Sequence, residues 1–526
     1  MARVLVTEKI AERGLDLLRQ AGHQVDVEEG LDPERLLGAV PGAHALVIRS
    51  ATTVTADVLA AGSDLVVVGR AGVGLDNVDV RAATERGVMV VNAPTANILS
   101  VAEHAMGLLL AQARNIPQAH AALVAGRWER SRWEGVELHG KVLGIVGLGR
   151  AGSLVAQRAL SFGMRLLAFD PYISSERARA MGVELRSVEE LFAEADFVTI
   201  HTPKTPETVG LVGRELLAKA KPGIRIVNTA RGGIVDEEAL AEAIRGGVVA
   251  GAALDVFATE PPPPGSPLLG LEQVILTPHL GASTEEAQDK AGVTIAEQVL
   301  LALAGDFVPY AVNVAATEVS EAVRPFMPLA EQLGRFLGCL HERLPDHLEV
   351  EVRGELAAAA TGILTLSALK GLFSTTTEEP VSYVNAPQLA EQRGLEVTET
   401  STATSPNYKS LITLRSGAHS VAATLAGAGV RAEPRVVMVD DHTVEVPPAP
   451  HMLVVRNDDR PGVVGAIGTA LGDAGISISS MAVGPSAEAG SHTALMVLST
   501  TEPTPDDVLD RLRGAVGILD LHRVAL

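Results

Sequence analysis

The hexapeptide GLGRAG at residues 147–152 directly follows the apolar run LGIV at residues 143–146 and opens an amphipathic stretch. Gly147 permits a tight turn after a strand, Gly149 lets a backbone come close to a pyrophosphate, and Gly152 lets a helix pack against the strand. The first turn of that helix adds unpaired N–H groups and the positive end of its dipole. The stretch therefore predicts a strand, a tight turn and a helix that together bind a dinucleotide.

Asp170 supports this interpretation from the end of the next apolar run, residues 165–169. A carboxylate about twenty residues after the glycines accepts hydrogen bonds from the adenosine ribose and repels a 2′-phosphate. Because no arginine follows Asp170 immediately, the sequence predicts NAD rather than NADP. A second glycine tract, GVG at residues 72–74, lacks the third glycine and leads into Asp76, so we interpret it as a loop near the substrate.

Short apolar runs alternate with helical segments over much of the chain. They lie at residues 3–6, 25–27, 46–48, 65–68, 142–146, 165–169, 197–201, 224–228, 251–256 and 274–276. This alternation predicts an α/β fold with parallel sheets and crossover helices that cover both faces. Ser100 and Glu103 have the spacing of a capping box, which predicts a helix from Ser100 to about Arg114 that connects two domains.

The sequence changes in character after about Asn313. Residues 315–449 contain an alanine-rich stretch and many serines and threonines, and we find no constellation of chemically active side chains there. PPAP at residues 447–450 predicts a linker. From Met452 to Leu526 the pattern predicts strand, turn, helix, strand, Gly/Ser loop, strand, helix and strand, which is a small α+β domain.

Composition excludes several classes of protein. A net charge of −21 argues against a nucleic-acid-binding protein. Cys339 is the single cysteine, which excludes an intrachain disulfide and a cysteine-rich zinc site, and we expect no metal. The first residues lack the apolar core of a signal peptide, and no apolar run is long enough for a membrane helix. We therefore expect a cytoplasmic protein with no nucleic-acid or membrane partner.

Arg231, Glu260 and His279 each follow a predicted strand of the dinucleotide-binding part. In an open α/β sheet, ligands bind beyond the carboxyl ends of the strands. A histidine titrates near neutral pH and can take a proton from a hydroxyl, and a neighbouring carboxylate can orient the imidazole. A guanidinium can grip a substrate carboxylate with two donors. These three residue types together suit the oxidation of a 2-hydroxy acid.

Three motifs surround these residues: NTARGG at 228–233, DVFATEP at 255–261 and TPHLGA at 277–282. With the 147–152 loop and Asp170, they resemble the D-isomer-specific 2-hydroxyacid dehydrogenase family over residues 1 to about 313. The resemblance implies that Arg231, Glu260 and His279 are the catalytic set. It also implies NAD contacts, beyond the three glycines and Asp170, at Arg150, Ala151, Thr202, Ala230, Asp255 and Ala282.

The resemblance further implies a particular domain order. A Rossmann-type nucleotide domain, residues 99–278, is expected to be inserted in a flavodoxin-like substrate domain made of residues 1–98 and 279–314. An intervening α+β domain, residues 315–449, with a second anion or allosteric substrate site, and an ACT-like domain of the ferredoxin type, residues 450–526, are expected to follow. The active site is expected in the cleft between the first two domains, which closes by hinge motion.

Five residues of the N-terminal part resemble the substrate-binding positions of family members that act on a phosphorylated acid: Arg49, Ser50, Arg70, Gly72 and Asn97. Guanidinium groups are well suited to phosphate. The expected reaction is oxidation of D-3-phosphoglycerate to 3-phosphohydroxypyruvate with NAD, the first step of L-serine biosynthesis. The alternatives are a family member that acts on glycerate or lactate, and a non-catalytic protein that senses NAD(H).

The C-terminal unit resembles ACT domains that pair and bind an amino acid at their shared edge. This implies L-serine as a feedback effector, bound near Asn457, Asp459 and Ser477. Asn457 and Ser477 depart from the residues common in the family at these positions. The tract RWERSRW at residues 127–133 resembles an arm used for subunit pairing, and aromatic side chains with arginine favour interfaces. Family members are homotetramers or dimers, and we expect a homotetramer.

Overall fold

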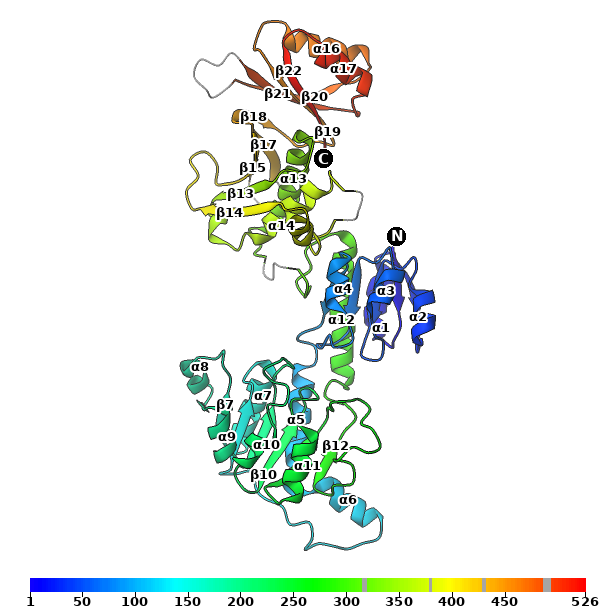
Figure 1. The fold of residues 1–526 in the computed structure, drawn as a ribbon, viewed down its shortest axis with the longest axis vertical. Helices are drawn as coiled ribbons and strands as arrows, with labels where there is room; N and C mark the ends of the chain where they lie inside the picture. The colour runs from blue at the N-terminus through cyan, green and yellow to red at the C-terminus, as the bar shows by residue number, and fades with distance from the viewer. Residues whose placement is uncertain (315–318, 378–380, 428–431, 486–492) are drawn as a thin grey trace.

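The structure is a computed structural model that describes residues 1–526 except 315–318, 378–380, 428–431 and 486–492. Its four β-sheets lie in a row along an elongated molecule, with the sheet of residues 142–276 at one end and that of residues 451–525 at the other (Figure 1). Within the described ranges, no helix combines the length and the apolar character needed to cross a bilayer.

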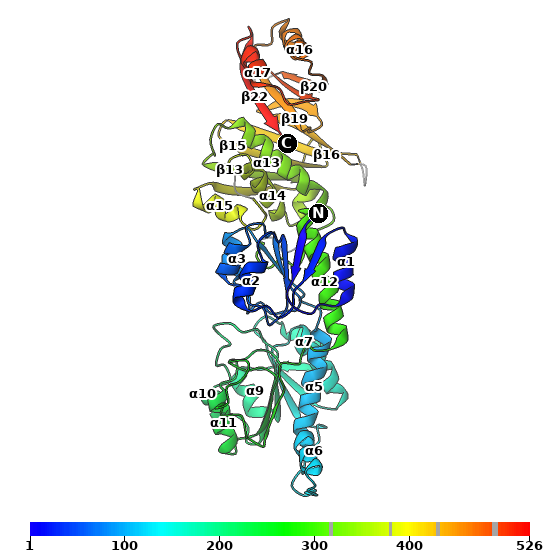
Figure 2. The ribbon, with the colours of Figure 1, turned by 90° about the vertical axis from the view of Figure 1, so that its right-hand side faces the viewer.

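The first unit is a five-stranded parallel sheet with helices on both faces. Its elements are β1 (Arg3–Val6), β2 (Gln24–Val27), β3 (Ala45–Ile48), β4 (Val67–Arg70), β5 (Met89–Asn92), α1 (Glu12–Gln20), α2 (Pro33–Ala39), α3 (Ala56–Ala61), α4 (Val80–Glu85) and α12 (Glu285–Ala304). The strand order β2-β1-β3-β4-β5 is flavodoxin-like and reverses between β1 and β3. Helices α1 and α12 cover one face of this sheet, and α2 and α3 cover the other (Figure 2). Val4 and Val6 belong to the apolar cluster on the side of α1 and α12, whereas Leu5 belongs to the cluster with α2 and α3.

The second unit is a seven-stranded parallel sheet in the order β12-β11-β10-β9-β6-β7-β8, which is Rossmann-type. Its strands are β6 (Val142–Val146), β7 (Arg165–Phe169), β8 (Val183–Leu185), β9 (Phe197–Ile200), β10 (Ile224–Asn228), β11 (Val249–Leu254) and β12 (Val274–Leu276). Its helices are α5 (Ile98–Arg114), α6 (Ile116–Val124), α7 (Arg150–Ser161), α8 (Ser175–Ala180), α9 (Val188–Glu194), α10 (Arg214–Ala218) and α11 (Glu237–Arg245). The strand order reverses between β6 and β9, where the glycine loop leaves β6.

Four strands begin and end at the predicted residues: 142–146, 165–169, 224–228 and 274–276. β4 begins two residues later than predicted, so Arg70 is its last residue and lies at the carboxyl edge of the sheet. The capping box at Ser100 and Glu103 is wrong, because α5 already begins at Ile98. The Ser100 hydroxyl lies 2.8 Å from that of Thr284, the N-cap of α12. This contact joins α5 to α12, the two helices at which the chain passes between the first and second units.

The third unit is a six-stranded sheet in the order β14-β13-β15-β16-β17-β18, antiparallel except for the parallel pair β13 and β14. Its elements are η1 (Arg324–Phe326), α13 (Met327–Leu340), β13 (His347–Gly354), η2 (Glu355–Ala358), α14 (Gly362–Phe373), α15 (Ala386–Gln392), β14 (Glu396–Thr402), β15 (Ser410–Ser416), β16 (His419–Ala426), β17 (Glu433–Val439) and β18 (His442–Val446). The Ser382 hydroxyl donates to the carbonyl of Gly87 at 3.0 Å, which docks this unit on the first.

The fourth unit has the predicted order of elements: β19 (His451–Asn457), α16 (Val463–Asp473), β20 (Ile478–Pro485), β21 (Ala494–Thr500), α17 (Asp506–Arg513) and β22 (Ile518–Ala525). The loop predicted to be rich in glycine and serine falls largely on residues 486–492, outside the described residues. Leu453 and Val455 face α16 and α17, whereas Met452 and Val454 join an apolar core that also contains α13 and the first unit. The second unit has cores of its own. The first, third and fourth units therefore share one apolar cluster, whereas the clusters of the second unit contain only its own residues.

Candidate active site

One cavity of about 450 Å³ lies at the carboxyl edge of the first sheet and reaches the second unit. It is lined by all five residues predicted to bind substrate and by two of the predicted catalytic residues: Arg49, Ser50, Arg70, Gly72, Asn97, Glu260 and His279. Ala282, predicted to contact NAD, lines it as well. The structure therefore brings into one place residues that are more than two hundred positions apart in the sequence.

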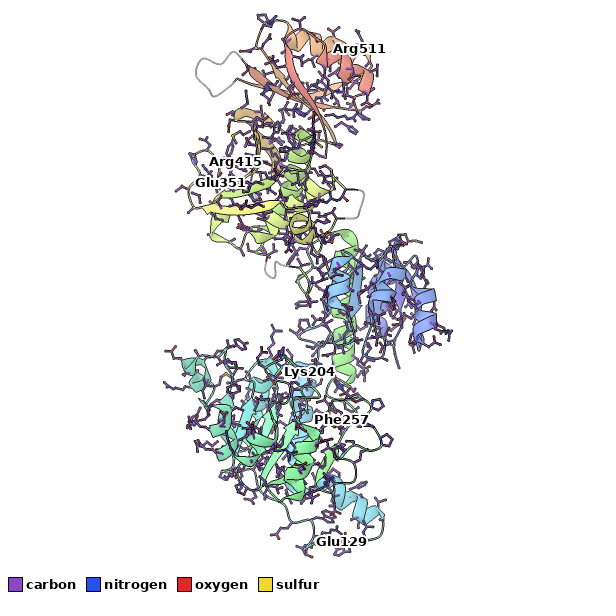
Figure 3. The ribbon with its side chains drawn as sticks, in the orientation of Figure 1. Glu129, Lys204, Phe257, Glu351, Arg415 and Arg511 are labelled. Carbon is purple, nitrogen blue, oxygen red and sulfur yellow. The ribbon has the colours of Figure 1, made fainter. Side chains whose placement is uncertain are left out.

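His279 and Glu260 form a pair in this cavity. His279 Nδ1 lies 2.7 Å from Glu260 Oε2, and Glu260 Oε1 accepts the backbone N–H of Phe257 at 3.0 Å. Phe257 lies at the end of the second unit that faces the first (Figure 3). Among the described contacts His279 Nε2 has no protein partner, so Glu260 holds Nδ1 and leaves the other ring nitrogen available.

Asp255 holds the turn that carries His279. Its Oδ1 accepts the Thr277 hydroxyl at 2.6 Å and the Leu280 N–H at 2.7 Å, and its Oδ2 accepts the Gly281 N–H at 2.8 Å. Burial alone would raise the pKa of Asp255, but His104, whose Nε2 lies 3.2 Å from Oδ1, and then the hydrogen bonds from Thr277 and the turn bring the pKa below the ordinary value. Asp255 is fully buried and serves the 277–281 turn, while its predicted contact with NAD stays a prediction.

Arg231 meets the first unit across the cleft. Its Nε lies 3.3 Å from Asp76 Oδ2, and its Nη1 donates to the carbonyl of Ala230 at 2.7 Å. An added Cβ at Gly74 would lie only 2.5 Å from Arg231 Nη2 and 2.8 Å from Asp76 Oδ2. The second glycine tract of the sequence therefore packs against Arg231, and its Gly72 lines the cavity, while its interpretation as a loop near the substrate stays a prediction.

Arg70 is the most enclosed cation of the cavity. Burial lowers the pKa of Arg70 first, and the positive charge of Arg231 lowers that pKa further, with a smaller effect of Arg49 in the same direction. Its Nε is buried with no hydrogen-bond partner in the described structure, and its guanidinium occupies the space that a side chain at Gly72 would fill. Like charges brought together in this way favour an anionic ligand between them.

The glycine loop after β6 has the geometry that a dinucleotide requires. Gly147 adopts a φ of 93°, and no atom lies within 4 Å of a Cβ placed on Gly149, which leaves the backbone open to a ligand. A Cβ on Gly152 would overlap the carbonyl oxygen of Gly147. Arg150 and Ala151 form the first turn of α7, whose N–H groups and dipole face the loop.

Asp170 is held in place beside that loop. Its Oδ2 accepts the N–H of Leu148, inside the glycine loop, at 2.8 Å, and its Oδ1 accepts the N–H of Tyr172 at 2.9 Å. The hydroxyls of Thr202 and Thr229, at the ends of β9 and β10, are buried with no partner in the described residues. A fixed carboxylate, an open glycine backbone and unpartnered hydroxyls fit the ribose and phosphate groups of NAD.

The predicted effector residues do not converge in one chain. The Asn457 side chain accepts the N–H of Asp459 at 3.0 Å, and its Nδ2 is buried without a partner in the described structure. Asn457 pairs with Ala494 at the start of β21, whereas Ser477 precedes β20 and bonds Thr501 just after the end of β21. Ser477 therefore lies about 20 Å along the sheet from Asn457.

Sequence reasoning assigned no site role to several residues that the structure places at the cavity, among them Lys9, Asp76 and Gln288, and Glu8 beneath the 49–52 turn. Glu8 and Lys9 follow β1 just past its carboxyl end, so the rule that located Arg231 also applied to them. A short strand followed by Glu and Lys is common in proteins and forms no motif, so the sequence alone does not indicate a role for Glu8 or Lys9.

Comparison with known families agrees with this fold and site. The family model "D-isomer specific 2-hydroxyacid dehydrogenase, NAD binding domain" matches residues 106–281. The fold and the site thus define an NAD-binding dehydrogenase of 2-hydroxy acids. Two further models match the C-terminal half, "D-3-phosphoglycerate dehydrogenase intervening domain" at residues 322–440 and "ACT domain" at residues 451–517.

Curated relatives match the whole chain. D-3-phosphoglycerate dehydrogenase of Mycobacterium tuberculosis is 50% identical over 528 residues, which cover 99% of each chain. The enzyme of the same name from Synechocystis is 45% identical and covers 100% of this chain and 95% of its own. The chain belongs to the D-3-phosphoglycerate dehydrogenase family, in the form that carries an intervening domain and an ACT domain.

Solved structures resemble the first two units. The TT0316 protein from Thermus thermophilus is 39% identical with a TM-score of 0.55 and covers 59% of this chain and 99% of its own. D-Lactate dehydrogenase from Aquifex aeolicus, complexed with NAD and lactic acid, is 26% identical with a TM-score of 0.52 and covers 58% of this chain and 96% of its own. The cofactor of the family is NAD.

Proposed function

We propose that the chain oxidises D-3-phosphoglycerate to 3-phosphohydroxypyruvate with NAD, the first step of L-serine biosynthesis. The observation that carries the proposal is the cavity itself, where Arg49 and Arg70 lie in the same space as His279. A 2-hydroxy acid needs one cation for its carboxylate, and the further guanidiniums suit a second, phosphorylated end. Relatives that match the full chain at 50% identity bear the name of this enzyme.

The catalytic roles follow from the geometry of the pair and of Arg231. His279 Nε2 accepts the proton of the substrate hydroxyl while Glu260, 2.7 Å from Nδ1, stabilises the protonated ring and holds its orientation. Arg231 exchanges Asp76 for the substrate carboxylate and polarises the forming carbonyl. NAD, when bound, supplies the acceptor for the hydride that leaves the carbinol carbon.

The cofactor site of this proposal is the edge of the second sheet around Asp170. The residues that hold NAD are Gly147, Gly149, Arg150, Ala151, Gly152, Asp170, Thr202, Ala230, Asp255 and Ala282. The fixed carboxylate of Asp170 and the buried Thr202 hydroxyl support this assignment. We also propose domain boundaries at residues 98, 278, 314 and 449, which the four sheets and the three matched family models support.

The test is the initial rate of NADH formation from NAD and D-3-phosphoglycerate, with D-glycerate and D-lactate measured beside it. The proposal expects a clear rate with the phosphorylated acid and little with the other two. The His279→Ala protein, prepared in the same way, controls for contaminating dehydrogenases. A rate with D-glycerate or D-lactate alone would move the assignment to another member of the family. NADH binding without turnover of any of the three acids would support a cofactor sensor.

Assembly into a homotetramer is part of the proposal. Trp128, on the predicted pairing arm, is 81% exposed, and Val124 at the end of α6 is 74% exposed. Glu129 marks this arm at the end of the molecule far from the cleft of its own chain (Figure 3). A partner subunit would cover these apolar side chains. Light scattering of the protein and of Trp128→Ser tests this, with a smaller particle expected for the variant.

L-serine inhibition is proposed through pairing of two ACT units. Because Asn457 and Ser477 lie at opposite ends of β21, a single serine could contact both only if they came from different chains. Titration of L-serine against turnover, in the protein and in Asn457→Ala, tests the effector and its site. A cytoplasmic location completes the proposal and is tested by cell fractionation.

A further inference from the structure

Glu8 binds three backbone N–H groups of one short turn. Its Oε1 accepts the N–H of Arg49 at 2.8 Å and of Thr52 at 2.9 Å, and its Oε2 accepts the N–H of Ala51 at 3.1 Å. Glu8 follows β1 and the turn follows β3. The strand order of the first sheet reverses between β1 and β3, which is where open α/β sheets bind their ligands.

Asn77 holds the same turn from its carbonyl side. Its Nδ2 donates to the carbonyl of Arg49 at 2.7 Å and to that of Thr52 at 2.6 Å. The hydroxyls of Thr7 and Thr52 lie 2.8 Å apart and are buried, which anchors the end of the turn to β1. Two side chains from outside the turn therefore bind both its N–H and its C=O groups.

The pattern leaves one N–H of the turn unused. In the part of the chain that the structure describes, the backbone N–H of Ser50 has no intramolecular partner, while the N–H groups on both sides of it donate to Glu8. Ser50 and Arg49 both line the cavity. An anion there could accept the Ser50 N–H together with the Arg49 guanidinium.

A carboxylate so near an anion site needs a reason, because its charge opposes the ligand. Only a carboxylate offers two acceptor oxygens with enough lone pairs for three N–H donors, whereas a glutamine would present N–H donors to the Ala51 N–H. The hydrogen bonds disperse the charge of Glu8 into the turn. The negative charge of Glu8, after that of Asp76, also offsets part of the lowering of the Arg70 pKa by burial and by Arg231.

We propose that Glu8 and Asn77 are positioning residues, which hold the 49–52 turn so that Arg49 and the Ser50 N–H bind the phosphate end of the substrate. The inference rests on the proposed function for the identity of the substrate. It assigns to the reaction two residues that do not touch the reacting atoms and that set how the phosphate is received. Loss of either residue loosens the turn and weakens phosphate binding, while His279, Glu260 and Arg231 stay in place.

The experiment compares Glu8→Gln, Glu8→Asp and Asn77→Ala with the unchanged protein. We expect the KM for D-3-phosphoglycerate to rise about tenfold or more in Glu8→Gln and Asn77→Ala, with kcat and the KM for NAD within about threefold of the original. Glu8→Asp keeps both oxygens and should recover part of the loss. Asp32→Ala, which removes a helix cap of the first unit away from the cavity, is the matched control and should leave both KM values unchanged.

A second measurement separates this inference from the proposed function. Calorimetric titration of inorganic phosphate into the NADH-loaded protein reports the anion site whatever acid is oxidised, and Glu8→Gln should bind phosphate about tenfold more weakly. Unchanged KM and unchanged phosphate affinity in Glu8→Gln would overturn the inference. The inference would also be overturned if kcat and NAD affinity in Glu8→Gln fell as much as the affinity for D-3-phosphoglycerate, because such a uniform loss indicates general unfolding. If the protein without substitutions binds phosphate but does not oxidise D-3-phosphoglycerate, the proposed function is contradicted and the inference about the anion site is not.

Discussion

Asp76 Oδ2 lies 3.3 Å from Arg231 Nε, so a carboxylate of the first unit is already paired with the guanidinium that the proposed mechanism assigns to the substrate carboxylate. The Asp76 side chain is 66% exposed and that of Arg231 is 29% exposed, which makes the pair easy for a ligand to displace. Asp76→Asn removes this competitor. We expect the KM for D-3-phosphoglycerate to fall by about two- to fivefold with kcat nearly unchanged, measured by steady-state kinetics.

Asp57→Asn is the control for Asp76→Asn, because Asp57 is an exposed acid of the same unit in the first turn of α3, and it should leave KM unchanged. A rise in KM for Asp76→Asn would mean that Asp76 orients Arg231 for the substrate rather than competing with it.

Gly74 is the second point at which Arg231 depends on the first unit. A methyl group there would approach Arg231 Nη2 to 2.5 Å, so Gly74→Ala must displace the guanidinium. We expect kcat/KM to fall by about 10- to 100-fold, because a displaced Arg231 guanidinium would misalign the bound substrate. Gly38→Ala, in a helix with no atom within 4 Å of the added methyl group, should keep full activity. Equal activity of the two variants would show that Arg231 has room to move.

His279 carries the proton in the proposed mechanism. His279→Ala should lower kcat by about 10²- to 10⁴-fold, the usual contribution of a general acid or base, and leave the affinity for NADH unchanged. Glu260→Gln keeps a hydrogen-bond acceptor but loses the charge that stabilises the protonated ring, so a smaller loss is expected. Turnover like that of the unchanged protein in His279→Ala would contradict the assignment.

Asp170 is proposed to discriminate between NAD and NADP. Its two oxygens are already oriented by the N–H groups of Leu148 and Tyr172, so the carboxylate is in place before the cofactor arrives. Asp170→Ala removes the repulsion of a 2′-phosphate, and the ratio of kcat/KM for NAD to that for NADP should fall by about tenfold or more. A ratio that does not change would show that other residues read the ribose.

The sequence predicted the order of elements and the residues of the cavity where neighbouring residues form a recognisable pattern. The strand at residues 142–146 and the glycines after it are such a case, because turn, strand and helix chemistry act within a few residues. The ends of β4 and α5 were wrong, since tertiary contacts decide how far a strand or helix extends. Arg70 is a strand residue for this reason rather than part of the loop.

Glu8 and Asp76 were not predicted as site residues for a different reason. Glu8 binds a turn about forty residues away and Asp76 binds Arg231 in another unit, so neither has a partner that a local pattern could show. Asp255 was predicted to contact NAD, which stays a prediction, but its hydrogen bonds to Thr277, Leu280 and Gly281 could likewise be seen only in the folded structure. Long-range polar partners appear only once the sheets are assembled.

Three histidines join the third unit to the fourth. The ring of His419, at the start of β16, lies 5.0 Å from that of His341 and 5.7 Å from that of His522 on β22. His419 Nδ1 is 3.0 Å from Asp440 Oδ2, and this hydrogen bond raises the pKa of His419 against the effect of burial. Burial, and then the charge of His419, lowers the pKa of His341. Of His419 and His341, His419 therefore holds a proton more readily.

A raised pKa in the folded state means that His419 stabilises the fold below its unfolded value of 6.5 and loses this effect as the pH rises through the folded value. His419→Gln should therefore lower the melting temperature by about 1–3 °C near pH 6, with the difference shrinking toward pH 9. Thermal melting of both proteins across this range is the measurement, with His120→Gln, at an exposed position, as control. A difference that is the same at every pH would mean that His419 contributes by packing and that its bond to Asp440 does not depend on the proton.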